Sequence, residues 1–142
     1  MNTIPNKIID FIMQQRACVL ATATLHENVH AAAMLYSCNE NLLELYFFTE
    51  KGTKKVEKLL DAKSCHASIV IGTTEELKQT LQLSGTLKIL EDSDAISMVK
   101  RIHYKKFPLS KSYENQETLF LAFTIEWWRH TDYESRPPII TE

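Results

Sequence analysis

Two adjacent lysines, Lys54 and Lys55, are the side chains with the clearest chemical potential in this sequence. They follow a strand-like apolar run at 42–49 and a turn at Gly52. Thr53, directly before them, is a good N-cap for a helix. Unpaired amides and the helix dipole make that end of a helix positive, so adjacent cations are unfavourable there unless an anion binds. Backbone amides, a hydroxyl and two ammonium groups suit a phosphate monoester. We therefore predict a phosphate site, with solvated lysines as the alternative.

A second motif, His26-Glu27-Asn28-Val29-His30, matches H-E-x-x-H. On a helix this spacing places two histidines on one face to hold zinc while the glutamate activates water. Apolar residues at helical spacing support that interpretation. The strand-like run that precedes the motif, and the lack of a nearby third ligand, favour a β-hairpin instead, with His26 in its turn and His30 at the start of a strand. A zinc hydrolase acting through His26, Glu27 and His30 is the less favoured hypothesis, and no metal site is predicted.

The other cysteines and histidines form no recognisable catalytic arrangement. Cys18, Cys38 and Cys65 are widely spaced without a C-x-x-C pair, which argues against a disulfide framework or a structural zinc site. We expect His103 and His130, which lie among polar residues, to titrate in solvent near the ordinary pKa of about 6.5. A triad is defined by geometry rather than by order, so spacing alone identifies no catalytic residue.

The elements that must position these residues are mostly strands. Alternating and β-branched runs predict six of them, at 17–24, 29–38, 42–49, 65–72, 79–90 and 118–128. Helices are predicted near the N-terminus, in the two-lysine segment, and from Asp92 or Ser93 to the residues before Pro108. Gly85, inside a strand, indicates a bulge or bend of the kind that closes a small barrel. The predicted fold is mainly β with a few helices (α+β), a six-stranded antiparallel barrel.

Length and composition limit the class of protein. A chain of 142 residues with 44% hydrophobic and 24% charged residues can build one hydrophobic core, so residues 1–142 are expected to form a single domain. The formal net charge of −2 argues against a dedicated nucleic-acid binder. No segment reaches the roughly 18 apolar residues of a membrane span, and the N-terminus lacks a signal-peptide core. We expect a soluble, unprocessed, cytoplasmic protein that binds neither nucleic acid nor membranes.

The order of these elements and several local strings resemble the FMN-binding split β-barrel superfamily typified by pyridoxamine 5′-phosphate oxidase. The strings, which span most of the chain, are Val19-Leu20-Ala21-Thr22, His30-Ala31, Tyr46-Phe47-Phe48-Thr49 followed by Thr53-Lys54-Lys55, and Leu83-Ser84-Gly85-Thr86. The third string is the most specific. The resemblance implies a split β-barrel of Greek-key type, and it implies that the predicted anion is the 5′-phosphate of FMN.

The resemblance also implies which residues contact the cofactor. They are Phe48, Thr49, Thr53, Lys54, Lys55 and Gln82. The two lysines would neutralise the phosphate, the threonines would donate hydrogen bonds, and Phe48 would border the flavin ring. Gln82 is included because strand alternation puts it on the same face as Thr80, where the glutamine of the family falls. Catalytic residues stay unassigned.

The chain also differs from the oxidase. Ala33 and Cys38 stand where the oxidase has an arginine and a lysine, and segment 104–110 (YKKFPLS) looks like a feature of an uncharacterised branch. The resemblance implies a homodimer with flavin between the subunits, an FMN-dependent oxidoreductase acting on an unidentified small molecule. The missing charges motivate an alternative, a dimeric barrel that binds flavin or haem without catalysis. By alternation Trp127 and Trp128 face opposite sides of the sheet, so one can border a ligand.

Overall fold

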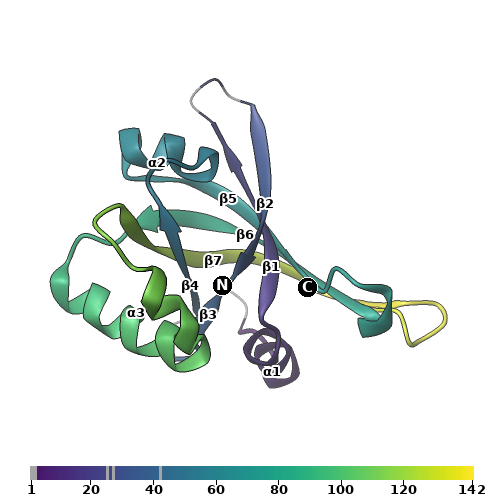
Figure 1. The fold of residues 1–142 in the computed structure, drawn as a ribbon. Helices are drawn as coiled ribbons and strands as arrows, with labels where there is room; N and C mark the ends of the chain where they lie inside the picture. The colour runs from purple at the N-terminus through teal and green to yellow at the C-terminus, as the bar shows by residue number, and fades with distance from the viewer. Residues whose placement is uncertain (1–2, 25, 27, 42) are drawn as a thin grey trace.

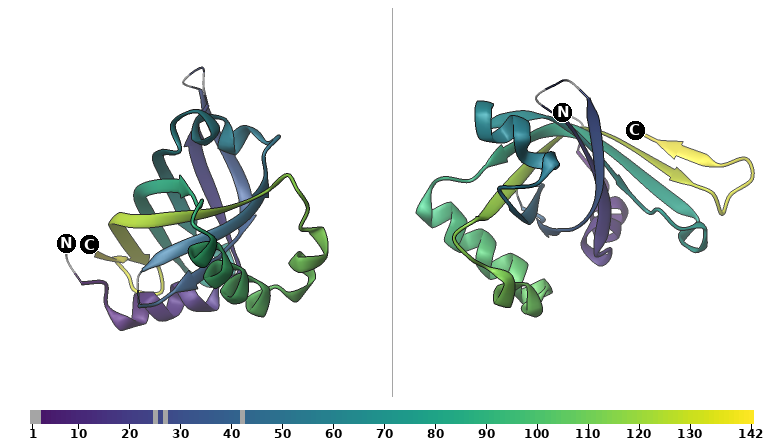
Figure 2. Two further views of the ribbon diagram at one scale, coloured as in Figure 1. Left: turned by 90° about the vertical axis from the view of Figure 1, so that its left-hand side faces the viewer. Right: turned by 45° about the horizontal axis from the view of Figure 1, so that its top comes forward.

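The fold is a curled antiparallel sheet with helices at its ends and on its outside, seen in a computed structural model that describes residues 3–24, 26, 28–41 and 43–142 (Figures 1 and 2). The strands are β1 (Ala17–Ala23), β2 (Val29–Leu35), β3 (Ser37–Asn39), β4 (Glu44–Glu50), β5 (Ser64–Ile71), β6 (Gln79–Ile89), β7 (Thr118–Asp132) and β8 (Ile139–Thr141). The α-helices are α1 (Asn6–Gln14), α2 (Glu57–Ala62) and α3 (Ser93–Lys106), and the 3-10 helices are η1 (Lys54–Val56), η2 (Glu75–Leu77) and η3 (Pro108–Tyr113). The predicted α+β split barrel is confirmed. The predicted count of six strands is wrong, because the described residues form eight.

Two short strands account for the difference. The strand expected at 29–38 is divided at Tyr36, whose ring is buried and whose hydroxyl donates a hydrogen bond to the carbonyl oxygen of Ile12. Side chains of β2 alternate between exposed and half-buried, whereas Tyr36, Ser37 and Cys38 are all buried. The chain therefore turns a corner at Tyr36 and begins a new strand. The other addition is β8, which pairs with the end of β7 where only an extended tail was expected.

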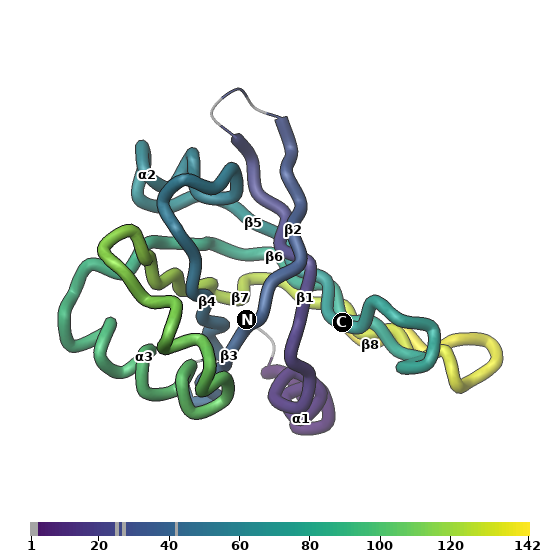
Figure 3. The backbone as a smooth tube through the Cα atoms, viewed as in Figure 1, coloured from purple at the N-terminus to yellow at the C-terminus, as the bar shows by residue number. Residues whose placement is uncertain are grey.

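The strand order is β2-β1-β5-β6-β7-β4-β3, with β8 attached to β7, and every pair is antiparallel. The neighbours β1 and β5 are not consecutive in sequence, nor are β4 and β7, so the chain crosses over rather than meandering (Figure 3). The sheet curls until β2 contacts β4. This junction, where two strands meet without forming a ladder, is the split of the barrel.

The main core fills the inside of the curl. Helix α1 covers one end of it, and its buried residues Ile8, Phe11 and Ile12 recur at the spacing of one helical face. On β4, Leu45 and Phe47 point into this core, as expected for alternate residues of a strand. The inner face of the sheet is thus packed with apolar side chains that form one core cluster.

Helix α3 covers the outside of β4 and β7 (Figure 1). Its N-cap is Asp92, one of the two predicted starting residues, and the Asp92 carboxylate accepts a hydrogen bond of 2.9 Å from the amide of Ala95. A second, smaller apolar cluster lies beneath it, built from Tyr46, Val99, Phe120 and Ala122. Strand β4 is therefore covered on both faces. No helix in the described ranges is long and apolar enough to span a membrane.

The bulge predicted at Gly85 is confirmed. The pairing of β6 with β7 shifts between Ser84 and Gly85, and a Cβ added to Gly85 would lie 1.9 Å from the carbonyl oxygen of Thr124. No side chain can occupy that space, so glycine is required by the close approach of the two backbones. Beyond the bulge Trp127 is 39% exposed and Trp128 is 5% exposed, which confirms that they face opposite sides of the sheet.

Candidate functional site

The two-lysine segment does not form the helix N-terminus that the sequence predicts. Lys54–Val56 is a single 3-10 turn, and α2 begins only at Glu57 and has six residues. The hydroxyl of Thr53 donates a hydrogen bond of 3.0 Å to the carbonyl oxygen of Glu50 instead of capping helical amides. So short an element has little dipole to offer, because the macrodipole is a sum over aligned peptides. Anion binding at this segment therefore depends on side chains.

A cavity of about 320 Å³ lies at the split, where β2 approaches β4 and α3 and η3 cover the outside. We call it the split cavity. Its lining residues are Ala33, Met34, Leu35, Phe48, Thr49, Lys55, His103, Ser110 and Tyr113. The structure thus brings together three of the cofactor contacts expected from the sequence, Phe48, Thr49 and Lys55. Thr53, Lys54 and Gln82 do not line this cavity.

Phe48 supplies a fixed aromatic wall. Its ring is parallel to the ring of His103, with 6.2 Å between the ring centres, and it meets the ring of Phe120 edge-on at 5.6 Å. The neighbouring Thr49 is buried and lines the same cavity. Aromatic packing on two sides holds the Phe48 rotamer, so the surface is ready for a flat ring before a ligand arrives.

Lys55 is the cation of the split cavity. Its side chain is half-buried, and this loss of water lowers the pKa of its ammonium group, an effect that the nearby Glu50 carboxylate partly offsets. The ion pairs found among the described residues do not include Lys55. A partly desolvated ammonium group without a bound counter-charge favours an anionic ligand. Lys54, on the same turn, is exposed and does not line the cavity.

Gln82 lies on the exposed outer face of β6, opposite Val70 of β5 and Arg129 of β7. The register continues from Val70 through Val19 to Ala33, which lines the split cavity. Gln82 and Ala33 are therefore three strand spacings apart, about 14 Å. They share one face of the sheet, but within one chain Gln82 does not reach the split cavity.

His103 is the residue of the split cavity that sequence reasoning missed. It is 2% exposed, and its Nδ1 lies 2.9 Å from the hydroxyl oxygen of Ser37. Burial, assisted by the positive charge of Lys106, lowers the pKa of His103 to about 4. The expectation that it titrates in solvent is therefore wrong. A signal was present in the sequence, because His103 follows Val99 by four residues and these two are the buried positions of α3.

The same expectation is wrong for His130. This side chain is buried, and its Nε2 lies 2.9 Å from the amide oxygen of Gln79. Burial lowers its pKa as well, with a smaller contribution from Lys7. His130 packs against Phe11 near α1 and does not line the split cavity. It therefore provides a comparison residue, a buried histidine away from the site.

The H-E-x-x-H segment does not lie on a helix. His26 is in an exposed turn, and His30 is in β2, paired with Thr22 of β1. The hairpin interpretation is confirmed, and Glu27 falls outside the described residues. Within the described ranges, no group of three or more histidine, cysteine, aspartate or glutamate side chains could hold a metal ion. The helical spacing on which the zinc hypothesis depends is therefore not present between His26 and His30.

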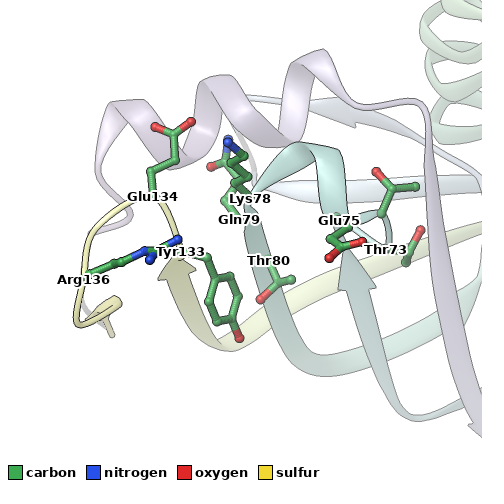
Figure 4. Close-up of a pocket in the computed structure, with 10 residues that line it drawn as sticks. Thr73, Glu75, Lys78, Gln79, Thr80, Tyr133, Glu134 and Arg136 are labelled. Atoms are coloured by element: carbon green, nitrogen blue, oxygen red, sulfur yellow. The ribbon is translucent and has the colours of Figure 1, made fainter.

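A larger cavity of about 680 Å³ lies between η2, the start of β6 and the β7–β8 hairpin (Figure 4). We call it the hairpin cavity. Its charged lining residues are Glu75, Lys78, Glu134 and Arg136, and all four are exposed. None of the residues predicted to contact a cofactor lines it. Its size alone gives no reason to assign it a ligand.

Comparisons with known proteins agree with the fold. The sequence profile of the family pyridoxamine 5′-phosphate oxidase matches residues 4–132. The conserved hypothetical protein Rv2991 of Mycobacterium tuberculosis is 19% identical, with a TM-score of 0.74 over 94% of this chain and 87% of that one. HutZ, the haem storage protein of Vibrio cholerae, is 13% identical, with a TM-score of 0.72 over 89% and 92%.

A protein of Clostridium acetobutylicum related to general stress protein 26, of the pyridoxinephosphate oxidase family, is 18% identical, with a TM-score of 0.69 over 96% of this chain and 92% of that one. Curated proteins give no match. At these identities the solved structures establish the fold, and the profile establishes the family. The chain belongs to the pyridoxamine 5′-phosphate oxidase family.

Proposed function

We propose that the protein binds FMN in the split cavity and acts as an oxidoreductase on an unidentified small molecule. One observation carries the proposal: Phe48, Thr49 and Lys55 line the same cavity. Together they provide an aromatic wall, a hydroxyl group and a half-buried cation without a bound counter-charge. These are the groups that a ring with a phosphate tail requires. Membership of a flavin-associated family supports the same conclusion.

The protein's own residues bind and orient the cofactor, and FMN supplies the redox chemistry. The ammonium group of Lys55 neutralises phosphate, the hydroxyl of Thr49 donates a hydrogen bond, and Phe48 borders the ring. Lys54 and Thr53 lie on the same turn outside the cavity and add charge and a polar group near its mouth. A cavity of about 320 Å³ is at the lower end of the range for small-molecule sites, so a further wall is needed.

A second copy of the chain provides that wall in our proposal. The outer face of β2, β1, β5 and β6 carries small uncharged side chains over its middle, where one row reads Ala31, Ala21, Ser68, Ser84 and Trp127. A sheet face that stays in water ordinarily carries charged and larger polar residues, so this face suits a homodimer contact. A partner on this face also gives Gln82, which is exposed there, a route to the flavin.

A second candidate function is haem binding without catalysis. The specific observation is that His103 lines the split cavity, because imidazole is a common axial ligand of haem iron. The structural similarity to a haem storage protein is in line with this candidate. It uses the same cavity and the same dimer, so the identity of the bound chromophore separates the two candidates.

The visible spectrum of the purified protein, before and after addition of FMN, tests the proposal. We expect a yellow protein with a flavin band and a mass in solution twice the chain mass of 16.4 kDa. Changing Lys54→Ala and Lys55→Ala together should weaken FMN binding by about 20- to 30-fold and reduce the band of the purified protein, because it removes both cations of the turn. Lys51→Ala is the matched control, an exposed lysine of the same segment that does not line the cavity.

Three results would contradict parts of the proposal. Protein that takes up no added FMN is not a flavoprotein. A haem band on titration with haemin, in protein that ignores FMN, would favour the second candidate. Light scattering that gives the mass of one chain at the concentrations used for the spectrum would exclude the dimer.

A further inference from the structure

His103 is held in place by two elements that are far apart in sequence. Its side chain comes from α3, and Ser37, its hydrogen-bond partner, opens β3. Both side chains are buried, and the rings of Phe48 and Phe107 flank the imidazole. Packing and hydrogen bonding therefore fix the orientation of the ring, which is what a ligand-contacting group needs.

The hydrogen bond to Ser37 also indicates which nitrogen of His103 carries the proton. The Ser37 hydroxyl forms no other hydrogen bond among the described residues. If Nδ1 donated to it, the buried hydroxyl proton would have no acceptor. The arrangement that satisfies both groups has the hydroxyl of Ser37 donating to Nδ1, so the proton of the neutral ring is on Nε2. The lowered pKa of His103 supports a neutral ring at physiological pH.

The Nε2 atom faces the split cavity. His103 is one of the residues that line it, and Nε2 has no hydrogen-bond partner among the described residues. Within that part of the chain, Thr22 Oγ1 is the buried side-chain polar atom without a partner. Since Nε2 is not such an atom, it reaches open space, and the cavity is the space that His103 lines. The split cavity therefore contains an N–H donor, Nε2 of His103, that has no acceptor among the described residues.

We propose that the Nε2–H of His103 donates a hydrogen bond to an acceptor atom on the ring of the bound flavin. This inference rests on the proposed function and adds a residue that none of the resembling strings contains. A flavin ring carries nitrogen and carbonyl acceptors along its edge, and hydrogen bonds to them orient the ring and tune its electronics. In this tautomer Nε2 has no lone pair free for iron, so haem binding at His103 requires the ring proton to move to Nδ1.

Binding titrations with FMN and with riboflavin test this contact. His103→Phe keeps a flat ring and removes the donor. We expect it to weaken the binding of both flavins by about 5- to 10-fold, the effect of one lost hydrogen bond. His103→Gln places an amide donor near the position of Nε2 and should stay within about 3-fold of the natural protein. His130→Gln is the matched control, a buried histidine away from the cavity, and should leave both affinities unchanged.

The outcomes are separable. If the natural protein binds FMN and His103→Phe binds equally well, this inference is wrong and the proposed function stands. A loss confined to FMN would place the donor at the phosphate and overturn the contact with the ring. If the natural protein binds neither flavin, the proposed function fails and this inference fails with it.

A measurement without any variant guards against misfolding. Nitrogen-15 NMR of the unsubstituted protein should show His103 as the neutral tautomer with its proton on Nε2. Finding the proton on Nδ1 would overturn the inference even if every variant failed to fold.

Discussion

The split cavity is the smaller of the two cavities, but its polar lining side chains are more deeply buried than those of the hairpin cavity. The hairpin cavity is about 680 Å³ and its charged side chains are exposed, whereas the split cavity is about 320 Å³ and contains buried Thr49 and His103 beside half-buried Lys55. A solvated charge gains little from a ligand because water already satisfies it. A desolvated group without a hydrogen-bond or ion-pair partner gains much more free energy from a ligand. The smaller cavity is therefore the better candidate for a site.

The two cavities also differ in construction. One connection and one hairpin form most of the hairpin cavity (Figure 4), so its walls are local in sequence. The split cavity takes Ala33 from β2, Phe48 from β4, Lys55 from η1, His103 from α3 and Ser110 from η3. Groups held by several packed elements keep their positions, which favours specific recognition.

The largest expected effect is the loss of stability in acid, which comes from His103 in the split cavity. The pKa of His103 is about 4 in the folded chain and about 6.5 when unfolded, so the unfolded chain binds more protons between these values. The stabilisation is complete above pH 6.5 and is lost as the pH falls to about 4. One pKa unit corresponds to about 1.4 kcal/mol, so the loss is at most about 3 kcal/mol.

Urea unfolding at pH 7.5 and pH 4.5 measures this loss. The difference in unfolding free energy between the two pH values should shrink in His103→Phe, in which the group that gains a proton on unfolding is gone. Glu75→Gln, in the hairpin cavity, should leave the difference unchanged because that side chain is exposed. An equal pH dependence in His103→Phe and the natural protein would contradict the buried neutral imidazole.

The next largest effect compares one aromatic residue from each cavity. Phe48→Ala removes packing against His103, Tyr104 and Phe120 and should cost about 2 kcal/mol, below the full cost for a completely buried phenylalanine because Phe48 is half-buried. Tyr133→Ala, at a residue 52% exposed, should cost about 0.5 kcal/mol or less. Urea unfolding at pH 7.5 checks both values, and similar costs would remove the distinction between the cavities.

The smallest effect separates the lysines. Lys55→Ala should weaken FMN binding by about 10-fold, because it removes a charge-assisted contact in a partly desolvated place. Lys54→Ala should weaken it by about 2- to 3-fold, since an exposed charge acts through water. Lys78→Ala, in the hairpin cavity, should have no effect. Fluorescence titration gives the three dissociation constants for FMN. A larger loss of affinity for Lys78→Ala than for Lys55→Ala would place the phosphate in the hairpin cavity.

Much of the fold could be predicted because hydrophobic alternation is a local signal. It located β1, β5 and β6 within one or two residues, and it placed Trp127 and Trp128 on opposite faces. Phe48, Thr49 and Lys55 are close in sequence, so their meeting in one cavity depends on a short segment. Features fixed within about ten residues were accessible from the sequence.

Features fixed by distant contacts were not. The corner at Tyr36 depends on a hydrogen bond to Ile12 in another element, and alternation gives no sign of it. His103 is buried because α3 packs on β4, and its spacing of four residues from Val99 was the one local sign of this among the nearby charged residues Lys105 and Lys106. For Gln82, alternation gave the face of the sheet correctly but not the distance across it, which depends on strand order.

The pairing of β4 with β7 has a consequence for synthesis of the chain. Strand β4, with its run Tyr46-Phe47-Phe48, ends at Glu50, but its partner begins only at Thr118. While the ribosome makes the residues between them, β4 can pair only with the three-residue β3, so one hydrophobic edge stays open. Open edges of this kind are where nascent chains aggregate. We therefore expect aggregation during synthesis to be most severe while this interval is being made.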